Sequence, residues 1–147
     1  MIAFDTNILV YTLDVRSPEH HARAEQAVSA ALLRGEALFP LQVLAEFQHV
    51  AVRKLGMSPA DALRAVETWS TAAMVEPYGI ADLRAAAAAQ AEHGLPLWDA
   101  LIWAVCDRAG VEVLASEDFQ NGRRLGRVTF LSPFDPANAH RLGLPRP

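Results

Sequence analysis

The sequence predicts an α/β fold, a three-layer α/β/α sandwich around a central, mostly parallel sheet of short strands. Short apolar segments alternate with longer segments of helical periodicity, which is the order that right-handed β-α-β crossovers produce. The apolar segments contain few polar residues, as is typical of strands covered on both faces. With 147 residues the chain is long enough for one core, so we expect a single domain over residues 1–147.

The expected strands are short apolar runs that end at polar or turn-forming residues. The first run ends at Asp5, the second is closed by Pro40, and the third is followed by Pro77 and Gly79. In order, the five strands are expected at residues 2–4, 37–39, 74–76, 112–115 and 128–131.

The expected helices are bounded by capping and stop signals. Ser17 and Ser58 each precede a proline, which suits an N-cap followed by the first helical turn, and Gly94 is a typical stop. We expect Leu63, Val66 and Trp69 to face inward, and Trp98 to belong to an apolar helix face with Leu101 and Ile102. The helices are expected at about 8–13, 18–34, 41–55, 59–73, 80–93 and 97–109, with an irregular proline-rich tail from about residue 132.

Composition narrows the class of protein. With 52% hydrophobic and 20% charged residues, the chain is not of the disordered type. No apolar run reaches the roughly 18 residues of a membrane span, and no basic leader is present, so we expect a soluble, cytoplasmic protein without a membrane partner. The single cysteine, Cys106, excludes an intrachain disulfide and fits a buried core thiol. The net charge of −4 neither indicates nor excludes nucleic-acid binding.

Four acidic residues stand out by position. Asp5 and Asp118 follow expected strands, Asp99 lies in the first turn of a helix, and Glu46 lies within an apolar helix. Taken singly, each has an ordinary explanation: a helix cap, an acid at a helix N-terminus, or a rim residue.

Taken together, the four acids indicate a cation site. The carboxyl ends of parallel strands share one edge of the sheet, and first-turn helix residues project from the same edge. Uncompensated carboxylates that converge there would raise one another's pKa. Such a cluster suits Mg²⁺, which prefers oxygen ligands. Histidines at zinc spacing, a cysteine pair and the glycine-rich phosphate-binding motifs are all absent from the sequence.

These motifs, in this order, resemble those of the PIN domain, and most closely the VapC-type toxins of bacterial toxin–antitoxin pairs. The resemblance rests on Asp5-Thr6-Asn7 after a short strand, Leu-Ala-Glu46-Phe, Leu-Trp-Asp99-Ala and Ser116-Glu117-Asp118-Phe, and it covers residues 1 to about 134. It implies a Mg²⁺- or Mn²⁺-dependent endoribonuclease, a cognate VapB-type antitoxin whose tail fills the active-site groove, and a homodimer.

The resemblance also implies a role for each motif residue. Asp5 and Asp99 match the principal metal ligands, Glu46 matches the third acid, and Asp118 matches the fourth. Thr6 and Ser116 would orient carboxylates or water through their hydroxyl groups, and Asn7 would support the turn or contact a phosphate. Glu117 departs from the pattern, because this position is often not acidic, and it leaves open whether Glu117 or Asp118 is the fourth acid.

From these residues we hypothesise metal-assisted hydrolysis of RNA phosphodiesters. Because the site is acidic, basic residues must steer the RNA backbone, and Arg123, Arg124, Arg127 and Arg16 are candidates. An ordinary solvated loop is the alternative explanation for these arginines. Two alternatives for the whole chain stay open: a catalytically inactive PIN-like module that binds RNA or protein, and another metal-dependent phosphatase. Phosphatases with an aspartyl nucleophile usually carry a second acid two residues later, where this chain has Asn7.

Overall fold

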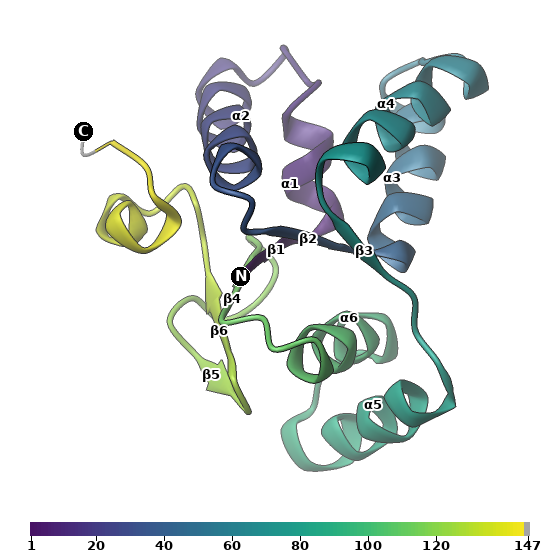
Figure 1. Cartoon of the computed structure of the whole chain (residues 1–147), viewed down its shortest axis with the longest axis vertical. Helices are drawn as coiled ribbons and strands as arrows, with labels where there is room; N and C mark the ends of the chain where they lie inside the picture. The colour runs from purple at the N-terminus through teal and green to yellow at the C-terminus, as the bar shows by residue number, and fades with distance from the viewer. Residues whose placement is uncertain (146–147) are drawn as a thin grey trace.

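The centre of the molecule is a sheet of short strands, seen edge-on in the computed structural model (Figure 1). The structure describes residues 1–145, so the last two residues of the expected domain lie outside it. Within this range the sheet has six strands in the order β3-β2-β1-β4-β6-β5. Every neighbouring pair is parallel except β5 with β6, which is antiparallel. The strands are β1 (Ile2–Phe4), β2 (Ala37–Pro40), β3 (Met74–Glu76), β4 (Val113–Ala115), β5 (Arg124–Leu125) and β6 (Val128–Leu131).

Helices cover both faces of the sheet. In Figure 1, α1 to α4 lie on one side of it, and α5 and α6 lie on the other. The predicted three-layer α/β/α sandwich with a mostly parallel sheet is therefore confirmed. The helices are α1 (Thr6–Tyr11), α2 (Pro18–Leu33), α3 (Leu41–Lys54), α4 (Pro59–Ala72), α5 (Ile80–His93) and α6 (Leu97–Arg108).

The register of the central strands brings the ends of β1 and β4 together. Ile2 pairs with Val113 and Phe4 pairs with Ala115, and both strands are fully buried. The backbone continues this pairing for one more residue, because Asp5 N donates to the Ala115 carbonyl at 2.9 Å. The residues that follow the two strands, Asp5 and Ser116, are thereby placed side by side.

Several local predictions were wrong. Leu63 is 44% exposed, because the face of α4 that packs on the core runs through the small Ala62 to Val66 and Trp69. Trp98 is 60% exposed and does not share the buried face of Leu101 and Ile102.

The segment from residue 132 was expected to be irregular, and it is more ordered than that. It contains the 3₁₀ helices η1 (Pro136–Asn138) and η2 (His140–Leu142), and it buries Ala139, Leu142 and Leu144 against the main core. The two-residue strand β5 was not predicted either. Cys106 is buried, as expected. Among residues 1–145, no helix has the length and apolar character needed to cross a membrane.

Candidate active site

Asp5 combines two roles at the end of β1. It is the N-cap of α1, with Oδ1 accepting from Thr6 N at 2.7 Å. Its second oxygen, Oδ2, accepts from Ser116 Oγ at 2.6 Å and from Asn7 Nδ2 at 3.4 Å. The carboxylate is only 6% exposed. The helix cap and the site residue are therefore the same side chain, and the two explanations do not exclude each other.

Asp118 joins Asp5 through the loop after β4. Asp118 N donates to Ser116 Oγ at 3.1 Å, and Asp118 Oδ2 accepts from Asn7 Nδ2 at 2.8 Å. Glu117 turns away from this pair, because its Oε1 accepts from the Tyr11 hydroxyl at 2.9 Å. Of the two neighbouring acids, Asp118 is the one that shares hydrogen-bond partners with Asp5.

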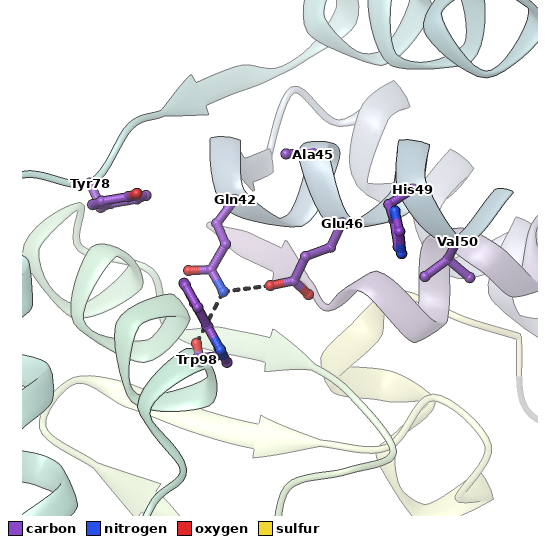
Figure 2. Close-up of a pocket in the computed structure, with 7 residues that line it drawn as sticks. All are labelled: Gln42, Ala45, Glu46, His49, Val50, Tyr78 and Trp98. Carbon is purple, nitrogen blue, oxygen red and sulfur yellow. Dashed lines mark hydrogen bonds between the residues drawn. The ribbon is translucent and has the colours of Figure 1, made fainter. Parts of the chain in front are cut away.

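Glu46 reaches the same edge of the sheet from the second turn of α3. Its Oε2 accepts from Thr6 Oγ1 at 2.9 Å, and its Oε1 accepts from Gln42 Nε2 at 2.6 Å. Gln42 Nε2 also donates to the carbonyl of Trp98 at 3.2 Å (Figure 2). Gln42 thereby links the helix that carries Glu46 to the first turn of α6, which carries Asp99.

Gln42 was not predicted from the sequence to belong to the site. The available signal was its position one turn before Glu46, since residues four apart lie on the same helix face. Tyr11, the partner of Glu117, was also missed, although it lies four residues after Asn7 on α1.

The acids are close enough to influence one another's ionisation. Burial raises the pKa of Asp5 to about 6, and the charges of Asp99 and Asp118 add to this rise, against the opposing hydrogen bonds from Ser116 and Thr6 N. Burial also raises the pKa of Asp99, together with the charges of Asp118 and Glu46. The structure thus brings all four predicted acids into one electrostatic neighbourhood, with Thr6, Asn7 and Ser116 between them.

The chemistry of these side chains fits a hard divalent cation. All four acids offer carboxylate oxygens as ligands, and the side chains around them carry hydroxyl or amide groups. Two buried amide oxygens, Asn7 Oδ1 and Gln42 Oε1, accept no hydrogen bond from any described residue. The hydration waters of a cation are donors of the kind that these oxygens need. Within residues 1–145, no three His, Cys, Asp or Glu side chains are already arranged as a metal centre.

Two grooves lie next to the acids. The aromatic groove has a volume of about 780 Å³ and is lined by Gln42, Ala45, Glu46, His49, Val50, Tyr78 and Trp98 (Figure 2). The α1 groove has a volume of about 410 Å³ and is lined by Thr6, Asn7, Val10, Tyr11, Asp14, Arg16, Val50, Lys54, Glu117 and Asp118. Val50 borders both grooves, so they adjoin along α3, with Glu46 lining the first and Asp118 lining the second.

The structure does not bring the three predicted arginines of the 123–127 segment to the acids. Arg124 belongs to β5 and pairs with Thr129, and Arg127 directly precedes β6. Since β6 runs parallel to β4, its first residue lies at the sheet edge opposite the acids. Arg123 lines neither groove. Arg16 does line the α1 groove, but it forms a bidentate ion pair with Asp14 at 2.7 and 2.9 Å.

Comparisons with known proteins identify a family for this chain and a fold that it shares with solved structures. The family model described as "PIN domain" matches residues 2–127. A comparison with curated protein sequences gave no match.

Several solved structures share the architecture. A toxin–antitoxin complex from Klebsiella pneumoniae is 20% identical, covering 90% of this chain and 98% of that chain with a TM-score of 0.68. VapBC2 from Rickettsia felis, bound to a DNA fragment from its promoter, is 14% identical over 90% and 98% of the two chains, with a TM-score of 0.64. VapC20 from Mycobacterium tuberculosis, a toxin that cleaves the sarcin–ricin loop, is 20% identical over 78% and 87%, with a TM-score of 0.62. At these identities the likeness concerns the fold.

Proposed function

Because the chain belongs to the PIN-domain family, we propose that it is a divalent-metal-dependent endoribonuclease, the toxin of a VapBC-type toxin–antitoxin pair. The observation that carries the proposal is the convergence of Asp5, Glu46, Asp99 and Asp118 at one edge of the sheet. Burial and the neighbouring acids raise the pKa of Asp5 and of Asp99, so the ionised forms of these two residues destabilise the folded protein unless a cation offsets their charge. A metal-dependent nuclease requires this cation, whereas a scaffold module does not.

The residues of the site have two proposed roles: some bind the metal, and others orient the carboxylates that bind it. Asp5 and Asp99 are the proposed ligands of Mg²⁺ or Mn²⁺, assisted by Glu46 and Asp118. When bound, the cation would lower the pKa of a water molecule and offset the charge that develops on the phosphate oxygens.

The neighbouring side chains fix the carboxylates in place. Ser116 and the Thr6 amide hold the two oxygens of Asp5, and Thr6 Oγ1 and Gln42 hold the two oxygens of Glu46. Asn7 holds Asp118, which supports Asp118 rather than Glu117 as the fourth acid. A carboxylate that does not bind the metal directly accepts the proton of the attacking water.

The partners are proposed from the family and from the solved relatives. The Klebsiella, Rickettsia and Salmonella typhimurium structures are toxin–antitoxin or VapBC complexes. We propose a cognate VapB-type antitoxin, a homodimer and action on RNA in the cytoplasm for this chain as well.

The test is cleavage of a mixed RNA pool by the purified chain, freed of any antitoxin, with Mg²⁺, Mn²⁺ or EDTA. We expect metal-dependent cleavage that is lost in Asp5→Asn and in Asp99→Asn. Glu67→Gln is the matched control, because Glu67 is an exposed acid on α4 outside the cluster. It should cleave at the wild-type rate.

Mn²⁺ binding measured by titration calorimetry separates the negative outcomes. Binding that needs Asp5 and Asp99, without cleavage, would indicate a nuclease whose RNA is absent from the pool. Neither binding nor cleavage would refute the proposal and leave the acids as helix caps.

A further inference from the structure

Two exposed aromatic side chains stand on the aromatic groove beside the acids. Tyr78 is 47% exposed and Trp98 is 60% exposed, and both lie across the groove from Glu46 and His49 of α3 (Figure 2). Large aromatic rings left in solvent at one site are typical of a binding surface. Glu46, one of the four acids of the proposed metal site, lines the same groove.

The backbone on both sides of Tyr78 is anchored. Arg108 Nη2 donates to the Pro77 carbonyl at 2.8 Å, and Arg108 Nε donates to Asp82 Oδ1 at 2.8 Å. Asp82 Oδ2 in turn accepts from Gly79 N at 2.8 Å. The network fixes the residues before and after Tyr78 and leaves its ring exposed. The backbone that carries this ring is therefore fixed before any ligand arrives.

Trp98 is fixed in a similar way. Its carbonyl accepts from Gln42 Nε2, the same group that donates to Glu46. The backbone of Trp98 and the carboxylate of Glu46 are thus held by one amide, while the indole ring projects from the first turn of α6 into the groove (Figure 2).

The charges of the groove indicate which part of a nucleic acid it accepts. Its titratable lining residues are Glu46, His49 and Tyr78, so it offers no lysine or arginine to a phosphate group. The α1 groove, which adjoins it at Val50, contains Lys54 and the paired Arg16 together with the acids Asp14, Glu117 and Asp118. The two cations of the adjoining grooves therefore lie in the α1 groove, and the exposed ring faces of Tyr78 and Trp98 lie in the aromatic groove.

We infer that the aromatic groove binds unpaired bases of the substrate RNA by stacking on Tyr78 and Trp98; this inference rests on the proposed ribonuclease function. Every base has a π-face, so stacking is tolerant of sequence but requires a base that is not already stacked in a duplex. The two aromatic residues would select single-stranded or looped RNA and position its backbone over the acids.

The inference is tested by RNA binding in the full-length chain carrying Asp99→Asn, which prevents cleavage. The probe is a fluorescein-labelled single-stranded RNA of random sequence, compared with a duplex of the same length. We expect Tyr78→Ala and Trp98→Ala each to weaken single-strand binding about tenfold, the usual effect of losing one stacked base. Tyr78→Phe and Trp98→Phe should restore binding, and binding of the duplex should not change. Leu33→Ala, which removes an exposed apolar side chain at the end of α2, is the matched control.

Tryptophan fluorescence supplies an independent signature. The chain has three tryptophans, and stacking of a base on Trp98 should quench part of their emission. Trp98→Phe should abolish that quenching while keeping the affinity.

Three outcomes would overturn the inference. Unchanged affinity in both alanine variants, with wild-type cleavage intact, would refute stacking and leave the proposed nuclease standing. Loss of self-association in the alanine variants, measured by light scattering, with unchanged RNA binding would assign the groove to a contact between copies of the chain. Failure of the wild-type chain both to cleave and to bind any RNA would refute the proposed function and the inference together.

Discussion

Replacing Asp5 with asparagine should stabilise the metal-free protein at neutral pH. Burial raises the pKa of Asp5 from 3.8 to about 6. One pKa unit corresponds to 1.36 kcal/mol of difference between the two protonation states, so the ionised carboxylate destabilises the fold by about 3 kcal/mol. Asparagine has nearly the same shape and no charge, and it caps a helix as well as aspartate does. Its Nδ2 replaces the oxygen that accepts from Ser116 and Asn7, so the gain in stability should be smaller than about 3 kcal/mol but still positive. We therefore expect Asp5→Asn to unfold at a higher urea concentration than the wild type at pH 8.

The stability of the wild type depends on pH because the folded and unfolded states bind the Asp5 proton with different affinity. Between about pH 4 and pH 6 the folded state holds the Asp5 proton while the unfolded state has lost it, so raising the pH through this window destabilises the wild type. Below this window Asp5 is protonated in both states and the difference from asparagine disappears. The advantage of Asp5→Asn should thus grow with pH between about pH 4 and pH 6, to at most about 3 kcal/mol above pH 6.

The assay is urea unfolding followed by circular dichroism in EDTA, at one-unit steps from pH 4 to pH 8. Glu67→Gln is the control, and we expect it to follow the wild-type curve. The reasoning would be refuted if Asp5→Asn were no more stable than the wild type at pH 8, or if its advantage were the same at pH 4. Adding Mn²⁺ should stabilise the wild type and not Asp5→Asn, because only a folded site with its ligands gains from binding.

Three further predictions follow from contacts described above. Ser116→Ala removes the donor to Asp5 Oδ2, so RNA cleavage should fall about 10- to 100-fold, as for residues that orient metal ligands. The pH profile of cleavage should also shift upward, because this hydrogen bond lowers the pKa of Asp5. An unchanged rate and an unchanged pH profile would contradict this role of Ser116. Arg108→Met leaves Asp82, which is 4% exposed, without its ion pair, and it should lower the free energy of unfolding in urea by about 1–3 kcal/mol. Cys106 is buried and its pKa is raised by that burial, so an aromatic disulfide reagent should modify it only as fast as the protein unfolds, and rapid modification of the native chain would show that the thiol is accessible.

The positions of the acids could be predicted because they depend on strand ends. A short apolar run followed by a polar residue identifies the end of a buried strand, and a parallel sheet places such ends at one edge. This reasoning placed Asp5 and Asp118 together without any knowledge of side-chain contacts. It also placed Asp99, because a helix's first turn is marked by the proline before it.

The features that were missed depend on tertiary packing. Nothing local distinguishes Leu63 from Ala62, and the structure buries the smaller residue because α4 packs closely on the core. Strand β5 has two residues and is defined only by its pairing with β6. Arg124 seemed close to Asp118 in sequence, but the intervening chain reverses direction and carries it to the opposite edge of the sheet.

Gln42 links the two outer layers of the sandwich where the four acids lie. It lies on α3, on one side of the sheet, and it contacts the Trp98 carbonyl of α6, on the other side (Figure 1). Any fluctuation that moves these helices apart by more than a hydrogen-bond length must break this contact or the one to Glu46. Widening of the groove and reorientation of the Glu46 carboxylate are therefore coupled through one side-chain amide.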